Sequence, residues 1–256
     1  AQLKRELWEK AAPALAANLG KATPEDFARA IMTTDAFHKI SHREVSLPGG
    51  VVKLVGMAKG AGMICPNMAT MLSVVLCDAQ VEASVWQKML RDAVELTFNR
   101  VTVDGDTSTN DTLYGLANGA SGVSASDEES LKALSAALTS VLGDLAYMLV
   151  KDGEGASKVA RIHVAGAASD ADAERVARTV GHSQLVKTAL YGRDANWGRI
   201  VAAVGRSGAD FNPDDVVVTL CGVELFRKGQ PTDLDFDALL EEPLKQRDLP
   251  IDIVLG

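Results

Sequence analysis

The sequence lacks an excess of basic residues. Among its 256 residues, 26 Lys and Arg stand against 34 Asp and Glu, which gives a formal net charge of −8 and a pI of about 5.1. Proteins that bind nucleic acid or anionic membranes without sequence preference carry a basic surface. We therefore expect neither nucleic acid nor a membrane among the partners of this protein.

Cysteine is also scarce, and long hydrophobic runs are missing. Cys65, Cys77 and Cys221 are far apart and form no C-x-x-C pair, which argues against a disulfide framework and against a zinc site. No apolar run reaches the length of a membrane span, and the charged N-terminus, A-Q-L-K-R-E-L-W-E-K, does not look like a signal peptide. These absences predict a cytoplasmic protein.

The rest of the chain mixes helical and strand-like patterns and has the composition of an ordinary globular protein, with 47% hydrophobic and 23% charged residues. Its length suits one large domain or two smaller ones. Apolar spacing and turn residues predict helices over about 3–19, 23–32, 84–98, 127–150 and 170–190. They predict strands within 41–58, on both sides of a Pro-Gly-Gly turn, and over 71–76, 101–103, 159–165, 215–220 and 251–255.

Two patterns raise the question of a metal site. His38 and His42 are four residues apart, but no carboxylate or cysteine partner stands out beside them. The run D-G-D-T-S-T-N-D at 104–111 begins like a calcium loop, yet Thr109 stands where that motif needs Gly and Gly115 where it needs Glu. We expect no metal, and an Asx-rich turn is the simpler interpretation of this run.

The most informative stretch is K-G-A-G-M-I-C-P-N-M-A-T-M-L, from 59 to 72. Its two glycines allow turns or close approach, and Pro66 prevents a helix across the segment. The small residue Ala69 is followed by the hydroxyl residue Thr70, and then by the apolar run M-L-S-V-V-L, which is typical of a buried strand. The stretch thus predicts a hydroxyl at the mouth of a buried strand, behind a flexible loop.

Such a placement suits a peptide bond that cleaves itself. Attack of Thr70 Oγ1 on the carbonyl carbon of Ala69 would shift the peptide to an ester, and water would release a new N-terminus at Thr70. A free α-amine has a reference pKa of about 7.7–8.0, so it can deprotonate the neighbouring hydroxyl near neutral pH. Threonine is also common in strands, and the Ala-Thr pair alone would favour a plain strand start.

Several segments together resemble the ornithine acetyltransferase family, also called bifunctional glutamate N-acetyltransferases. Precursors of this family split at Ala-Thr inside a K-G-x-G-M-I-x-P-N-M-A-T-M-L segment, which matches residues 59–72 throughout. The resemblance extends to A-I-M-T-T-D at 30–35, to D-G-E-G-A-S-K at 152–158, where Ser157 replaces a Thr, and to Y-G-R-D-A-N-W-G-R-I at 191–200. A run like that at 104–111 also lies near the active site of the family.

The resemblance implies an α/β fold, a layered α-β-β-α-like sandwich of the self-cleaving N-terminal-nucleophile type. Residues 1–69 would be the C-terminal part of an α chain and residues 70–256 most of a β chain, with cleavage between Ala69 and Thr70. The assembly would be a heterotetramer of two α and two β chains. The implied reaction is ping-pong acetyl transfer from N2-acetylornithine to glutamate in arginine biosynthesis, through an acetyl ester on Thr70. No cofactor is required, but acetyl-CoA is a candidate co-substrate because some members accept it.

The resemblance also implies substrate-binding residues, which are Thr33, Lys59, Thr70 and Glu154. From their charges, Lys59 can pair with a substrate carboxylate and Glu154 with the side-chain ammonium of the acetyl donor. Thr33 could instead cap the preceding helix, and a Glu between glycines is usually solvated. We expect the run at 104–111 to support the site without taking part in the chemistry. The segment 191–200 either lines the site or forms a glycine-organised turn.

Two other classes of function stay open on the sequence alone. One is an N-terminal-nucleophile aminopeptidase or amidase of similar architecture, which would pass the acyl group to water. The other is a non-catalytic subunit that keeps the fold. The family's S-T-G-x-I-G motif, which supplies the oxyanion donors, and its C-terminal tail with a substrate-binding Asn and Thr are not found here. We therefore expect the sequence to be incomplete at both ends.

Overall fold

The computed structural model describes residues 4–65 and 71–256 and divides into two compact units. Among the described residues, the first unit holds 4–61, 71–99 and 107–152. The second unit holds Gly62–Cys65, Arg100–Asp106 and Gly153–Gly256. The expected division into two chains at Ala69–Thr70 is a different kind of boundary. It lies outside the described residues and stays a prediction.

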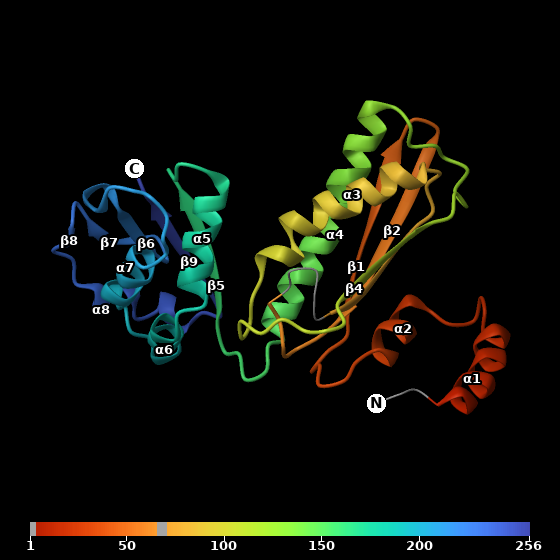
Figure 1. Ribbon diagram of the computed structural model, residues 1–256, viewed down its shortest axis with the longest axis horizontal. Coiled ribbons are helices and arrows are strands. Elements are labelled where there is room, and N and C mark those ends of the chain that lie inside the picture. The colour runs from red at the N-terminus through yellow and green to blue at the C-terminus, as the bar shows by residue number, and fades with distance from the viewer. Residues whose placement is uncertain (1–3, 66–70) are drawn as a thin grey trace. The chain divides into compact units, whose positions relative to one another are not determined.

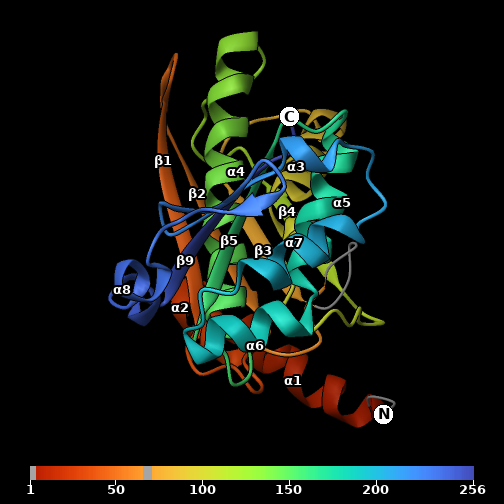
Figure 2. The ribbon, with the colours of Figure 1, turned by 90° about the vertical axis from the view of Figure 1, so that its left-hand side faces the viewer.

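The first unit is a four-stranded sheet with helices. Its elements are α1 (Arg5–Ala17), α2 (Pro24–Ala30), β1 (Lys39–Leu47), β2 (Gly50–Lys59), β3 (Leu72–Cys77), α3 (Ala83–Leu96), β4 (Thr112–Ala117) and α4 (Glu128–Lys151). The strand order is β1-β2-β3-β4, with antiparallel pairs except for the parallel pair β3·β4. The long helix α4 runs beside β1 and β2 (Figures 1 and 2), and α3 packs on α4 and β4.

Local sequence explains most of these helix boundaries. Thr23 caps α2, because its hydroxyl accepts from Asp26 N at 3.2 Å while the Asp26 carboxylate accepts from Thr23 N at 2.8 Å. Pro24 occupies the first turn, where the missing N–H is harmless. The Asp127 carboxylate caps α4 by accepting from Ser130 N at 2.9 Å, and Glu128 and Glu129 follow in the first turn, where negative charge is favoured. These helix starts agree with the sequence prediction.

By length and composition alone, α4 could cross a membrane, and it is the one helix of the described residues that could. The sequence analysis had expected no apolar run long enough to span a membrane, so this helix corrects it. One face of α4 is buried inside the first unit, where the helix contacts β1, β2 and α3. The buried apolar side chains are Leu134, Leu138, Val141, Leu142, Leu145, Ala146 and Leu149. This face of α4 is part of the core of the first unit.

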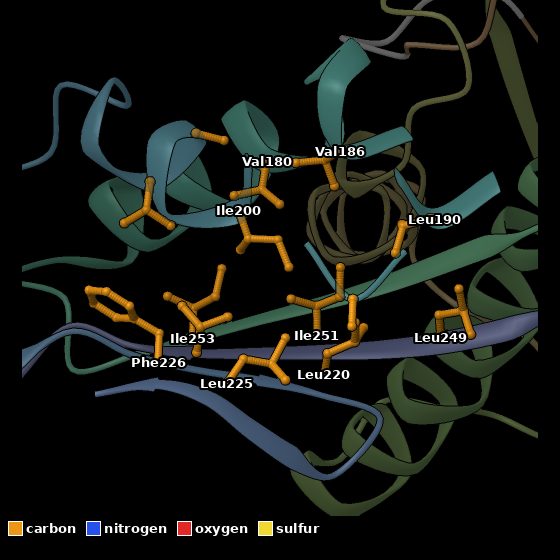
Figure 3. Close-up of a cluster of buried hydrophobic side chains, with 14 of the residues drawn as sticks. Val180, Val186, Leu190, Ile200, Leu220, Leu225, Phe226, Leu249, Ile251 and Ile253 are labelled. Carbon is orange, nitrogen blue, oxygen red and sulfur yellow. The ribbon is translucent and has the colours of Figure 1, made fainter. Parts of the chain in front are cut away.

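The second unit is a five-stranded sheet with four helices. Its elements are β5 (Val159–Ala165), α5 (Asp170–Gly181), α6 (Gln184–Gly192), α7 (Trp197–Gly205), β6 (Val217–Leu220), β7 (Val223–Arg227), β8 (Gln230–Pro231), α8 (Phe236–Leu240) and β9 (Asp248–Val254). The strand order is β5-β9-β6-β7-β8, and only β5·β9 is parallel. The core lies between the helices and the sheet, where Val180, Val186 and Ile200 face side chains of β6, β7 and β9 (Figure 3).

Two sequence expectations for individual elements are corrected, and some elements were missed. The strand expected at 101–103 does not form, because Val103 N bonds to the carbonyl of Ile64 in a single 2.6 Å contact without a strand ladder. The helix expected over 170–190 is two helices, since Ser183 caps α6 through Val186 N. Helix α7 and the edge strand β4 were not foreseen. The α/β class itself is confirmed, with one mainly antiparallel sheet in each unit.

Gly56 shows how closely α4 approaches β2. A Cβ at position 56 would lie 2.6 Å from Val141 Cγ1 and 2.9 Å from Leu145 Cδ1, and both side chains are fully buried. We expect Gly56→Ala to lower the free energy of unfolding by about 1–3 kcal/mol, because the buried neighbours have no room to move. Chemical denaturation monitored by circular dichroism measures the change.

The matched control is Gly143→Ala on α4 itself. There the added Cβ meets only Thr97 Cγ2 at 3.8 Å, an ordinary contact. Replacing glycine by alanine inside a helix should raise stability by about 0.5–1 kcal/mol. Equal effects of the two substitutions would contradict the close packing of α4 on β2.

Candidate active site

The predicted nucleophile Thr70, together with Ala69, lies outside the described residues. The chain is described again from Met71, which is buried. Met71 O accepts a hydrogen bond from Thr112 N at 2.8 Å, and Leu72 then begins β3 between β2 and β4. The expected buried strand after Thr70 is therefore present, and it occupies an interior place in the sheet.

Two of the predicted substrate-binding residues meet in the first unit. Lys59 ends β2, and its Nζ donates to Thr33 Oγ1 at 2.7 Å. Thr33 follows the end of α2 and is exposed, and its described hydrogen bonds go to Lys59 and Asp35 instead of to the helix end. Lys59 is also the register partner of Leu72 across β2·β3. Lys59 therefore places the pair beside the start of β3.

Buried charged side chains hydrogen-bond to the backbone next to this pair. Asp35 Oδ1 accepts from Gly60 N at 2.6 Å and Oδ2 accepts from Thr33 N at 3.0 Å. The fully buried Lys39 donates to Asp35 and to Asp152, each at 2.6 Å. Burial by itself raises the pKa of the Asp35 carboxyl, but the hydrogen bonds from Gly60, Lys39 and Thr33 outweigh it and hold that pKa below its usual value. Asp35 is thus kept ionised.

Glu154 belongs to the second unit and lies in the loop between α4 and β5. Its side chain is exposed, and it packs against Gly62 of the same unit. A Cβ on Gly62 would be 3.0 Å from both the carboxyl carbon and Oε1 of Glu154. The Glu154 carboxylate thus lies within contact distance of position 62. The negative charge of Glu154 therefore lies against the loop that leads toward Thr70.

Asp104 holds the same loop. Its Oδ2 accepts from Met63 N at 2.6 Å and its Oδ1 from Ile64 N at 3.0 Å. Met63 has a φ of 58°, a left-handed conformation that is unfavourable for a residue with a side chain, and the two bonds compensate for it. The first aspartate of the run 104–111 thus holds this loop, while support of the active site by the run stays a prediction. No group of three or more His, Cys, Asp or Glu suited to a metal ion occurs in the described part of the chain.

Asp111, the last aspartate of the run, is a feature that the sequence analysis missed. Both of its carboxylate oxygens are buried, and neither has a hydrogen-bond partner among the described residues. Burial raises the pKa of Asp111 to about 7. It immediately precedes β4, next to the Thr112–Met71 bond. An Asx-rich run gives no sequence signal that one member is buried and unpaired.

A Cys–His contact in the second unit was also missed. His182 Nε2 lies 3.6 Å from Cys65 Sγ and 3.1 Å from Thr102 Oγ1. Burial, with the positive charges of Lys187, Arg178 and Arg206, lowers the pKa of His182. A neutral imidazole is therefore favoured there. No disulfide joins the three cysteines, all of which are described.

The segment 191–200 forms the turn between α6 and α7. Arg193 ends α6 in a left-handed conformation, and Asn196 caps α7 by accepting from Arg199 N at 3.2 Å. Trp197 stacks on Phe226 with ring centroids 5.4 Å apart. All these contacts organise the second unit internally. They fit the structural interpretation of the segment, and its role in lining the site stays a prediction.

Comparison with known proteins establishes the family. The sequence profile of the ArgJ family matches residues 1–256. The chain belongs to the ArgJ family. It is 72% identical over 256 residues to the arginine biosynthesis bifunctional protein ArgJ of Nitratidesulfovibrio vulgaris, with all of this chain and 65% of that protein covered. It is 47% identical over 232 residues to the protein of the same name from Thermosynechococcus vestitus, with 90% of this chain and 55% of that protein covered.

A solved structure of the family supports the fold. The crystal structure of arginine biosynthesis bifunctional protein ArgJ from Bacillus halodurans matches with a TM-score of 0.67 and 36% identity. The match covers 70% of this chain and 84% of that one. The chain spans only 65% and 55% of the lengths of the two relatives named above. The ArgJ comparison thus confirms the fold class, while the activity of the complete protein is a matter for proposal.

The buried Asp111 carboxyl predicts an unusual dependence of stability on pH. Because its pKa is raised in the folded state, from 3.8 to about 7, the native protein binds this proton more tightly than the unfolded chain does. The group therefore destabilises the fold as pH rises from about 4 to 8. Asp111→Asn removes this ionisation. Its stability relative to wild type should increase over that range by about 1–3 kcal/mol, a figure reduced for solvent screening.

Denaturant unfolding at pH 4 and pH 8 measures this difference. Asp144→Asn is the control, because Asp144 is half exposed in the same unit and paired with Arg43 at 2.7 Å. Its stability relative to wild type should not rise with pH. A pH-independent difference for Asp111→Asn would show that this carboxyl is not buried in its neutral form.

Proposed function

We propose that this protein transfers an acetyl group from N2-acetylornithine to glutamate, through an acetyl ester on Thr70 formed after cleavage between Ala69 and Thr70. The observation that carries the proposal is the Lys59–Thr33 pair, with 2.7 Å between Lys59 Nζ and Thr33 Oγ1. The pair lies beside the start of the strand that follows Thr70 in sequence. Membership of the ArgJ family and the names of its relatives support the same pathway.

The Lys59–Thr33 pair suits a carboxylate. Because the Thr33 oxygen accepts from Lys59 Nζ, its own hydroxyl proton is left to donate to a third group. A carboxylate placed between the two would accept one bond from an ammonium and one from a hydroxyl, and charge-assisted bonds of this kind are among the stronger ones. Both N2-acetylornithine and glutamate carry an α-carboxylate, so one subsite would serve the two half-reactions.

The N-terminal Thr70 would supply both the nucleophile and the base for the acetyl transfer. Its amine takes the hydroxyl proton while Oγ1 attacks the acetyl carbonyl carbon, the amide C–N bond breaks, and ornithine leaves with that proton. In the second half, the glutamate amine attacks the ester carbonyl carbon, the bond between that carbon and Thr70 Oγ1 breaks, and the proton that the glutamate amine loses passes to Oγ1. Glu154, exposed and ionisable, would pair with the side-chain ammonium of N2-acetylornithine. No metal or redox group enters this scheme.

Three further parts of the proposal concern the surroundings of the reaction. Acetyl-CoA would serve as an alternative acetyl donor in the same ester chemistry. The two chains made by cleavage would assemble as a heterotetramer of two α and two β chains. The cytoplasm would be the compartment, in keeping with the sparse and widely spaced cysteines of the sequence.

We expect Thr70→Ala to abolish both cleavage and acetyl transfer, because the substitution removes the nucleophile of both steps. Intact-mass measurement should find the wild-type protein in two pieces divided before Thr70 and the variant as one chain. Thr179→Ala is the control, since the Thr179 hydroxyl donates to Arg175 O of its own helix. Acetyl transfer by an uncleaved Thr70→Ala variant would assign the nucleophile elsewhere. Glutamate-independent hydrolysis of N2-acetylornithine by wild type would instead favour an amidase.

Glu154→Gln tests the recognition of the donor. Losing a charged partner costs about 1.5–3 kcal/mol, so kcat/KM for N2-acetylornithine should fall about 10- to 100-fold. In a ping-pong reaction each kcat/KM reports its own half-reaction. The value for glutamate, which has no side-chain ammonium, should therefore stay within about twofold. Lys59→Met is the contrast, because it should lower both values, and equal losses for Glu154→Gln would refute the assigned role.

A further inference from the structure

Lys39, the first residue of β1, is a charged side chain with no access to solvent. Its Nζ lies 2.6 Å from Asp35 Oδ1 and 2.6 Å from Asp152 Oδ2, and Phe37 O is 3.4 Å away. The side chain of Asp35 is likewise fully buried, and that of Asp152 is 3% exposed. A buried ammonium is tolerated only when its charge and its donors are satisfied, and two carboxylates satisfy it here.

Each carboxylate also holds backbone amides. Asp35 accepts from Thr33 N and from Gly60 N, the amide directly after Lys59. The Asp35 carboxylate therefore fixes two segments of backbone, one at Thr33 and one next to Lys59. Asp152 accepts from Ala36 N at 3.1 and 3.3 Å.

The Lys39 charge thus joins three segments of the first unit. They are 33–36 after α2, 59–60 at the end of β2, and the end of α4 at 152, and the first two carry Thr33 and Lys59. A half-exposed ion pair of the same unit, Arg43–Asp144, links β1 to α4, and its side chains are 38% and 42% exposed. A pair of that kind contributes little to stability, whereas breaking a buried one is costly.

We propose that Asp35 and Lys39 are positioning residues of the carboxylate subsite, which set the distance between Thr33 and Lys59 and never touch the substrate themselves. The inference rests on the proposed function for the identity of the substrate. The spacing matters because a carboxylate that bridges a hydroxyl and an ammonium needs both donors within hydrogen-bond reach at once. Without Asp35, the backbone amides of Thr33 and Gly60 lose their common acceptor.

The direct test is Asp35→Asn in the complete protein. Lys39→Met would leave two buried carboxylates facing each other and is prone to unfold. Asp35→Asn is milder, because the new side chain keeps one oxygen as acceptor for Lys39 and Gly60. Its NH₂ group is then turned toward Thr33 N, so that two donors oppose each other there. We expect kcat/KM to fall at least about tenfold for N2-acetylornithine and for glutamate.

A substrate without the carboxylate separates positioning from general damage. N-acetyl-1,4-diaminobutane matches N2-acetylornithine but lacks that group. Wild type should use this analogue poorly, and Asp35→Asn should use it within about twofold of wild type, because the two losses share one cause and are not additive. A loss on the analogue as large as on N2-acetylornithine would overturn the proposal. Asp144→Asn, the control, should behave like wild type with both substrates.

Hydrogen exchange at the amides of Thr33 and Gly60 gives a readout that does not depend on activity. The Thr33 amide should exchange about tenfold faster or more in Asp35→Asn than in wild type, since it loses its acceptor, whereas the Gly60 amide keeps the remaining oxygen and should change less. Unchanged exchange at Thr33 would overturn the positioning role whatever the kinetics show. If wild type itself transfers no acetyl group, the proposed function fails, while faster exchange would still support Asp35 as the residue that holds the two segments.

Discussion

The buried charge of Lys39 is the interaction on which the site-bearing part of the first unit depends. An ammonium with no solvent access is stable only between acceptors, and the chain supplies Asp35 and Asp152 for this purpose. Those carboxylates also accept hydrogen bonds from backbone N–H groups. The carboxylates that neutralise Lys39 therefore also constrain the backbone at those N–H groups. The backbone so constrained brings Thr33 and Lys59 together.

The sheet of the first unit supplies the second constraint. The antiparallel register of β2·β3 sets Lys59 opposite Leu72, and α4 lies close against β2 at Gly56. A strand so tightly covered cannot shift by one residue without exchanging its buried and exposed faces. The end of β2 therefore has a definite place beside the start of β3, and the same holds for the Lys59 side chain.

The loop from Gly62 to Cys65 is held by side chains that are distant in sequence, and not by strand pairing. Asp104 accepts from the amides of Met63 and Ile64, and Glu154 lies against Gly62. The loop forms no regular structure, so its shape depends on these acceptors. In the same run as Asp104, Asp111 is buried without a partner among the described residues. Identical residue types a few positions apart thus have opposite electrostatic surroundings.

Local sequence determined much of this protein. The capped starts of α2 and α4, the Pro-Gly-Gly turn between β1 and β2, and the family motifs at 59–72 and 152–158 are all legible in the chain, because each depends on residues within a few positions. Tertiary structure alone decided that Asp35 would reach Gly60, that Lys39 would reach Asp152, and that Asp111 would be buried with no partner in the described part of the chain. Edge strand β4 and the break between α5 and α6 also escaped prediction. These features depend on groups far apart in sequence, and neither periodicity nor propensity carries information about which distant groups share a buried site.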